Sequence, residues 1–140
     1  MGRFTISVNL SPAQLHDPRL AANLLSILAE AGADPRRLKV EITETAVMAD
    51  ADIALSVMKE LRAEGMAVAL DDFGAGYSSL GYLRQLPLDQ LKIDRSLISG
   101  VDGDDEKRAI LEMILTLCDR LDLSVVVEGI ENERELSCVP

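Results

Sequence analysis

The chain has 140 residues, 48% of them hydrophobic and 27% charged, which is typical of one globular domain and not of a disordered segment. Its formal net charge of -10 opposes binding to nucleic acid and to membrane surfaces, because both partners are anionic. No apolar run is long enough to span a membrane and the N-terminus lacks a signal-peptide pattern, so we expect a cytoplasmic protein with no DNA or membrane partner.

Short apolar segments alternate with helical stripes along the whole chain. Strands are expected at residues 4–10, 38–43, 66–71, 89–94 and 123–128. The stretches between them carry helical stripes, with stop signals at Gly32, Gly65 and Pro87, a further stripe from Ile110 to Leu121, and a last helix near Asn132. The strand–helix order predicts an α/β fold with a parallel sheet.

In each predicted strand a short apolar run is followed by a polar residue, and these polar residues have the same parity relative to the apolar positions. They are Asn9, Glu41, Asp71 (followed directly by Asp72), Lys92 and Glu128. Alternate residues of a strand face opposite sides, and parallel strands end at one edge, so these side chains should converge. Their oxygens are ligands for a hard divalent cation such as Mg²⁺ or Mn²⁺, and adjacent carboxylates repel unless a cation lies between them. Lys92 would neutralise charge developing on a phosphoryl group or orient a water.

The inner positions of the strands distinguish two parallel architectures. They are polar or small, as at Lys39, Thr43, Ala67 and Ala69, whereas the outer positions are branched and apolar. A doubly wound sheet buries both faces under helices and should be apolar throughout. The pattern therefore favours the wall of a TIM-barrel-like fold.

Two residues near the predicted site allow more than one interpretation. Glu44 could cap the following helix, or it could hold the loop at 73–79 through backbone N–H groups. Lys92, at a barrel strand end, could be the nucleophile of a Schiff-base lyase. Its acidic neighbours oppose that second hypothesis, because they raise the pKa of a lysine.

Five segments resemble a known family in order and spacing: VNLS (8–11), EITET (41–45), DDFGAGYSSL (71–80), LPLDQLKIDRSLI (86–98) and VVEGIE (126–131). The chain is similar to the EAL-domain family of cyclic di-GMP phosphodiesterases in bacterial signalling. This resemblance implies a modified TIM barrel in which two Mg²⁺ or Mn²⁺ ions activate a water that opens the dinucleotide to pGpG. It implies metal ligation by Asn9, Glu41, Asp71, Asp72 and Glu128.

The same resemblance assigns roles to the other site residues. Lys92 would assist the nucleophilic water, and Glu44 would anchor the loop at 73–79, which takes part in dimerisation in the family. Asp94 and Glu131 also fall on motif positions of the family. We expect Lys92 and Glu44 to act in catalysis, while the carboxylates and Asn9 hold metal.

The sequence also departs from the family pattern. The Glu-Ala-Leu motif, whose glutamate is a metal ligand, would precede VNLS, and a Gln-Gly strand would follow VVEGIE; the sequence contains neither. We therefore expect residues 1–140 to form a single partial EAL domain of about five βα units, with weakened metal binding and hydrolysis. The alternative is an inactive remnant that binds the dinucleotide or a partner protein. Unpaired edges at 4–10 and 123–128, or the 73–79 loop, predict a homo-oligomer.

Overall fold

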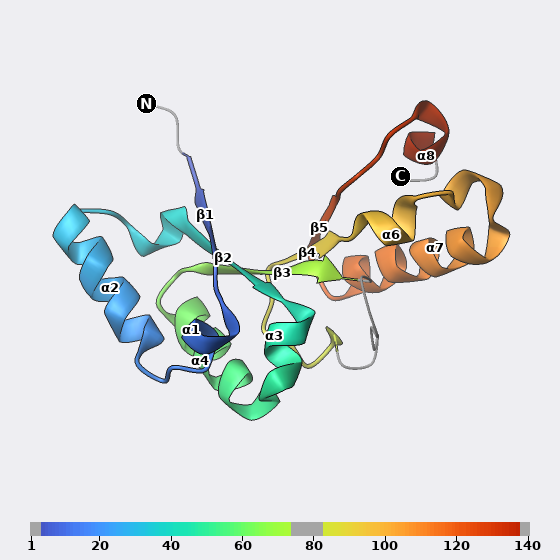
Figure 1. The fold of residues 1–140 in the computed structure, drawn as a ribbon. Helices are drawn as coiled ribbons and strands as arrows, with labels where there is room; N and C mark the ends of the chain where they lie inside the picture. Colours follow the sequence, from blue (N-terminus) through green and yellow to red (C-terminus); the bar gives the residue numbers. More distant parts are fainter. Residues whose placement is uncertain (1–3, 74–82, 138–140) are drawn as a thin grey trace.

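The computed structural model describes residues 4–73 and 83–137 and contains one parallel sheet (Figure 1). Its strands, in the order β1-β2-β3-β4-β5, are β1 (Ile6–Asn9), β2 (Leu38–Thr43), β3 (Ala67–Phe73), β4 (Gln90–Ile93) and β5 (Ser124–Val127). Every neighbouring pair is parallel. Because the strand order equals the chain order, each crossover steps one strand in the same direction, as in a TIM-barrel wall and unlike a doubly wound sheet.

The described helices vary widely in length. The α-helices are α1 (Pro12–Leu15), α2 (Leu20–Ala31), α3 (Glu44–Ala49), α4 (Ala51–Ala63), α6 (Arg95–Ile98), α7 (Asp105–Arg120) and α8 (Glu133–Ser137). Two 3₁₀ turns, η1 (Pro35–Arg37) and η2 (Val101–Gly103), complete the described elements. The longest, α7, has 16 residues, and none of the described helices combines the length and apolarity needed to cross a bilayer.

The outer face of the sheet makes the core. Side chains from β2, β3 and β4 are fully buried there, and residues of α4 and α7 pack against them: Val40, Ile42, Val68, Leu70, Leu91, Ile93, Met58, Leu61, Leu111 and Ile114. The strand β1 is exposed along its whole length, as expected of an edge strand. The prediction of an apolar outer face and a polar inner face is confirmed, and with it the TIM-barrel-like assignment.

The helix α2 ends at a predicted stop signal, and α4 begins at a side-chain cap. Gly32 closes α2 with a left-handed φ of 67°, which glycine adopts at little cost, and Asp50 caps α4 by accepting from the N–H of Ile53. The helix predicted to end at Pro87 falls largely within residues 74–82, which lie outside the described residues.

Three short helices that the sequence periodicity did not predict follow β1, β2 and β4 directly. Ser11, Thr43 and Asp94 cap them, each accepting a hydrogen bond from a backbone N–H two or three residues later. Helices of four to six residues are too short to display a helical period, which is why they were missed. They lie at the carboxyl ends of β1, β2 and β4, the edge of the sheet near which Glu41 and Lys92 meet.

Candidate metal centre

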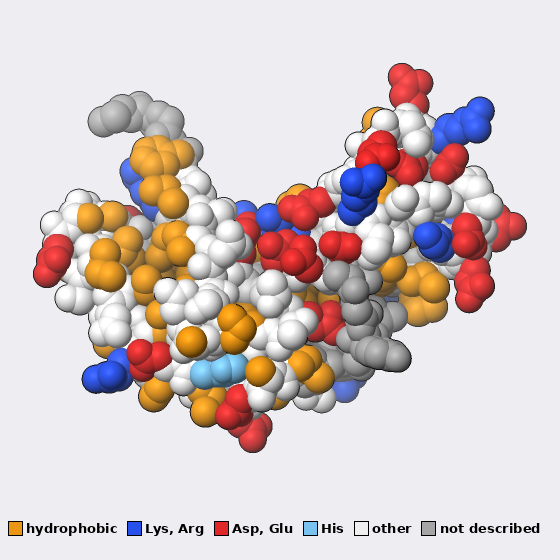
Figure 2. Space-filling view, in the orientation of Figure 1, with side chains coloured by type: hydrophobic (Ala, Val, Ile, Leu, Met, Phe, Trp, Pro, Cys, Tyr) orange, Lys and Arg blue, Asp and Glu red, His pale blue; other side chains and the backbone are white. Residues whose placement is uncertain are grey.

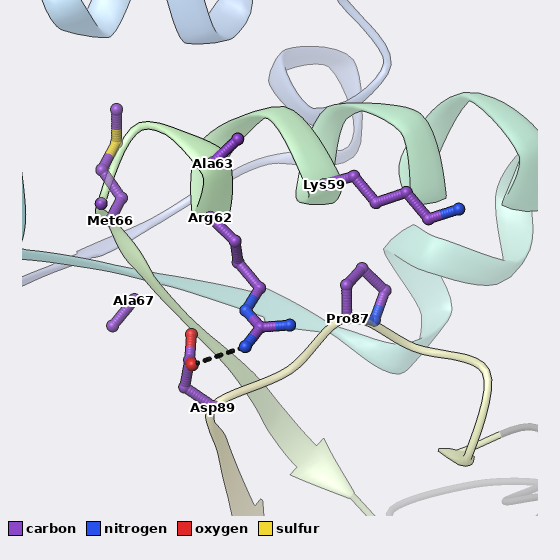
Figure 3. A pocket seen from close by; sticks show the side chains of 8 residues that line it. Lys59, Arg62, Ala63, Met66, Ala67, Pro87 and Asp89 are labelled. Carbon is purple, nitrogen blue, oxygen red and sulfur yellow. Dashed lines mark hydrogen bonds and ion pairs between the residues drawn. The ribbon is translucent and has the colours of Figure 1, made fainter.

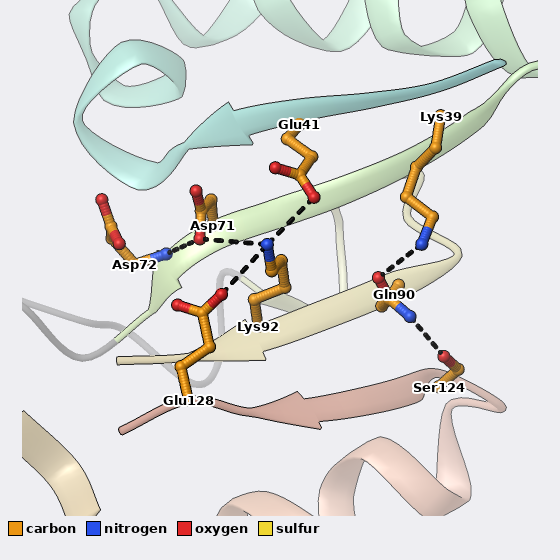
Figure 4. A network of polar contacts seen from close by, with 8 residues as sticks. All are labelled: Lys39, Glu41, Asp71, Asp72, Gln90, Lys92, Ser124 and Glu128. Carbon is orange, nitrogen blue, oxygen red and sulfur yellow. Dashed lines mark hydrogen bonds and ion pairs between the residues drawn. The ribbon is translucent and has the colours of Figure 1, made fainter. Parts of the chain in front are cut away.

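The concave side of the sheet carries a cluster of charged side chains at the carboxyl ends of the strands. Figure 2 shows acidic and basic side chains gathered in a hollow between two raised ends of the molecule. Lys92 lies in the middle of this cluster (Figure 4). Its Nζ is 3.0 Å from Glu41 Oε1, 3.0 Å from Glu128 Oε1 and 4.0 Å from Asp71 Oδ1. The cluster thus joins the ends of β2, β3, β4 and β5.

A bulge in β3 brings two consecutive aspartates to the same site. Successive residues of a regular strand point to opposite faces, so Asp71 and Asp72 should diverge. The pairing of β3 with β4 shifts register between Leu70 and Phe73, and Asp72 has a φ of 56°. As a result, carboxylate oxygens of Asp71, Asp72 and Glu128 all lie within 4.8 Å of one another. The N–H of Asp72 also donates to Asp71 Oδ1 at 2.9 Å, which fixes the first carboxylate.

The cluster carries more negative than positive charge, because the ammonium of Lys92 lies among four carboxylates. The hydrogen bond to Glu41 raises the pKa of Lys92, with further support from Glu128 and Asp71, and outweighs the opposite effect of burial. Lys92 therefore stays protonated, which argues against the Schiff-base hypothesis. Burial raises the pKa of Asp72, and the negative charges of Asp71, Asp94 and Glu128 raise it further. The surplus negative charge is the kind that a divalent cation neutralises.

The predicted residues are not all equally close to this centre. Asn9 ends β1 and pairs with Glu41 in the sheet register, so it lies at the rim of the cluster on an exposed edge. Glu44 is the first residue of α3, just after the cap Thr43. The loop that Glu44 was expected to anchor lies outside the described residues from residue 74 onward, so its role stays a prediction.

The segment after β5 is fixed by contacts that the sequence did not reveal. Gly129 has a φ of 79°, and a Cβ there would come within 2.6 Å of the Arg95 side chain, so only glycine fits. Glu131 forms an ion pair with Arg95. The buried Glu135 accepts from the N–H of Glu131 at 3.0 Å and from that of Gly100 at 3.1 Å. These contacts hold the turn that presents Glu128, whose own N–H donates to the carbonyl of Ile93.

Another set of inner-face residues was not predicted as part of the site. Lys39, Gln90 and Ser124 form a hydrogen-bonded bridge on the same face as the carboxylates, nearer to the amino ends of the strands (Figure 4). They have the same parity as Glu41, Lys92 and Glu128 and precede them by two or four residues. This shared parity could have predicted that the three side chains lie on the inner face, but it does not predict which inner-face residues contact one another.

A cavity of about 440 Å³ lies at the opposite, amino end of β3 and β4, lined by Lys59, Arg62, Pro87 and Asp89 among others (Figure 3). Arg62 Nη2 pairs with Asp89 Oδ1 at 3.1 Å. The other oxygen of Asp89 accepts from the N–H of Val68 at 2.9 Å. Arg62 and Asp89 therefore form a matched ion pair among the described residues at this end of the sheet.

Comparison with known proteins decides the family. A family model described as "EAL domain" matches residues 1–139. The chain belongs to the EAL domain family. Among curated EAL relatives, it is 39% identical to the bifunctional diguanylate cyclase/cyclic di-GMP phosphodiesterase MucR of Pseudomonas aeruginosa, covering 94% of this chain and 19% of that protein. The chain spans only 16% to 20% of the length of this and three further relatives.

Solved EAL structures share the fold. The chain matches the cyclic di-GMP complex of the PaMucR phosphodiesterase with a TM-score of 0.85 and 38% identity, over 96% of this chain and 55% of that one. It matches the manganese and cyclic di-GMP complex of Klebsiella pneumoniae BlrP1 with a TM-score of 0.88 and 36% identity, over 98% of this chain and 35% of that one. A calcium complex of BlrP1 is also similar. The predicted family and fold class are therefore confirmed.

Proposed function

We propose that this chain is a metal-dependent phosphodiesterase domain that hydrolyses cyclic di-GMP to pGpG. The observation that carries the proposal is the bulge that brings Asp71, Asp72 and Glu128 within 4.8 Å of one another on the concave side of the sheet. Family membership supports it, as do the similar phosphodiesterase MucR and the similar structures that contain cyclic di-GMP.

The donor set fits hard divalent cations, and we assign Mg²⁺ or Mn²⁺ to it. Asp71, Asp72 and Glu128 would hold the metal, with Glu41 and Asn9 as further ligands from β2 and β1. Bound divalent cations would activate a water and polarise the phosphodiester. Manganese is present in a similar EAL structure, which supports this class of ion.

Lys92 would act on the substrate directly. Its ammonium is held in place by Glu41 and Glu128 and stays protonated because those carboxylates raise its pKa. From the middle of the cluster it can donate to a phosphoryl oxygen that gains negative charge, or orient the attacking water. Glu44 would contribute indirectly, by anchoring the loop at 73–79.

A second candidate function is a non-catalytic module that binds the dinucleotide or a partner protein. The observation that favours it is the edge strand β1, whose four residues are all exposed and which pairs only with β2 among the described strands. Pairing of that edge with another chain would produce the homo-oligomer that the sequence predicts. In this case the chain would bind cyclic di-GMP or a partner protein without hydrolysing the dinucleotide.

The test is incubation of the chain with cyclic di-GMP and Mn²⁺ or Mg²⁺, with pGpG measured by chromatography. The variant Asp71→Asn should abolish turnover, whereas Asp119→Asn, an exposed aspartate on α7, should not change it. Binding of cyclic di-GMP without turnover would support the second candidate. If the chain neither binds nor hydrolyses cyclic di-GMP, both the phosphodiesterase and a dinucleotide-binding module are contradicted, and only binding of a partner protein is left.

A further inference from the structure

A polar bridge crosses the inner face of the sheet below the carboxylate cluster. Lys39 Nζ donates to Gln90 Oε1 at 3.0 Å, and Gln90 Nε2 donates to Ser124 Oγ at 3.0 Å (Figure 4). The side-chain amide of Gln90 thus serves both as acceptor and as donor. The bridge joins β2, β4 and β5, although β3 lies between β2 and β4.

Small residues on β3 make this crossing possible. Lys39 pairs with Ala67 in the sheet register, and Gln90 pairs with Ala69. The strands β2 and β4 are about 10 Å apart, two strand spacings, which a lysine and a glutamine side chain can span together. Only methyl groups lie beneath them on β3, so the bridge can form without a clash.

The same strands carry the charged cluster closer to their carboxyl ends. Glu41 follows Lys39 by two residues on β2, Lys92 follows Gln90 by two on β4, and Glu128 follows Ser124 by four on β5. Lys92 spans these strands in the upper layer just as the bridge does in the lower one. The distance between Glu41 and Glu128 therefore depends on the spacing of the same strands that this bridge joins.

We propose that Lys39 is a positioning residue for the candidate metal centre, which it serves by holding β2, β4 and β5 in register through Gln90 and Ser124. The inference rests on the metal-binding part of the proposed function. It makes a prediction opposite to that of simple electrostatics. A positive charge near a cation site repels the cation, so removal of Lys39 as a charge alone would tighten metal binding. If Lys39 is a positioning residue, its removal instead weakens metal binding.

The experiment measures Mn²⁺ affinity of the full chain by titration calorimetry, together with thermal unfolding of each variant. Lys39→Met should weaken Mn²⁺ binding about tenfold, the usual effect of losing a residue that orients metal ligands. Gln90→Leu should cause a similar loss without any change of charge, and the double variant should be no worse than either single one. Lys39→Arg should recover most of the affinity, and Lys59→Met, an exposed lysine on α4, should leave it unchanged.

The outcomes separate this inference from the proposed function. Unchanged or tighter Mn²⁺ binding by Lys39→Met, with normal binding by the wild type, overturns the inference alone. A wild-type chain that binds no Mn²⁺ overturns both the inference and the metal site. If Lys39→Met does not fold, Ser124→Ala decides, since it removes only the last bond of the bridge; a severalfold loss of affinity supports the inference, and no loss overturns it.

Discussion

The two ends of the sheet use charge in different ways. At the amino end, Arg62 pairs with Asp89, and Asp89 also accepts from a backbone N–H of β3. At the carboxyl end, Lys92 faces a group of carboxylates that outnumber it. A matched pair needs nothing from outside the chain, whereas a surplus of buried or half-buried negative charge is stabilised by an external cation. This difference is consistent with a structural role for the amino end and supports the proposal of a metal site at the carboxyl end.

The two ends also differ in their exposure to solvent. The side chains of Arg62 and Asp89 are 43% and 38% exposed, whereas those of Lys92 and Glu41 are 17% and 10% exposed. Solvent screens the first pair much more than the second, so equal changes should have unequal effects at the two ends.

The largest losses of stability and of turnover are expected from Lys92→Met. It removes the only described cation in contact with Glu41, Asp71 and Glu128, and leaves half-buried carboxylates facing one another. We expect a loss of about 2 kcal/mol in the free energy of unfolding without metal, and a fall of about 10²- to 10³-fold in turnover. Added Mn²⁺ should raise the unfolding temperature of this variant more than that of the wild type, because metal replaces the missing charge. An equal Mn²⁺ effect on both proteins would contradict the functional assignment of this end.

A smaller effect is expected at the amino end. Asp89→Ala removes both the ion pair and the acceptor of the Val68 N–H, and should cost about 1–2 kcal/mol in urea unfolding. The variant Arg62→Met removes the exposed ion pair only and should cost about 0.5 kcal/mol. Neither should change the turnover of cyclic di-GMP per folded molecule. A large loss of turnover in either variant would break the distinction between the two ends.

The smallest expected effect is a gain in the free energy of unfolding, from Asp72→Asn. The pKa of Asp72 is raised in the folded chain, so the unfolded chain ionises first and stability falls as the pH rises above the ordinary value of 3.8. Asp72→Asn avoids this loss, and asparagine tolerates the φ of 56°. We expect the metal-free variant to be about 0.5 kcal/mol more stable at neutral pH, a modest gain because Asp72 is exposed.

Two conditions sharpen this last prediction. The gain from Asp72→Asn should disappear at pH 3, below the ordinary carboxyl pKa, because Asp72 is then protonated in both states. With Mn²⁺ present, the wild type should become the more stable protein, since the variant lacks one carboxylate ligand. Thermal unfolding with chelator and with Mn²⁺ measures both effects, and a gain that persists with Mn²⁺ would argue against Asp72 as a ligand.

The amino-acid pattern alone predicted the strands, their alternation with helices in an α/β fold, and the polar face of each strand. It could do so because the period of two in strands such as residues 38–43 is a local property of the chain, set by the backbone. Parity and the parallel arrangement were enough to predict that Glu41, Asp71, Lys92 and Glu128 meet at one edge. The motifs at 71–80 and 86–98 identified the family, which the comparisons confirmed.

The arrangement of those residues within the site became clear only from the packing of the folded chain. The bulge that brings Asp72 beside Asp71 depends on the register of β3 against β4, a relation between segments that no local period encodes. The contact of Lys39 with Gln90 likewise joins strands that are not adjacent, and it depends on the alanines of β3 between them. A pattern along one strand tells which way a side chain points, but the partner it reaches is fixed by the packing of the whole sheet.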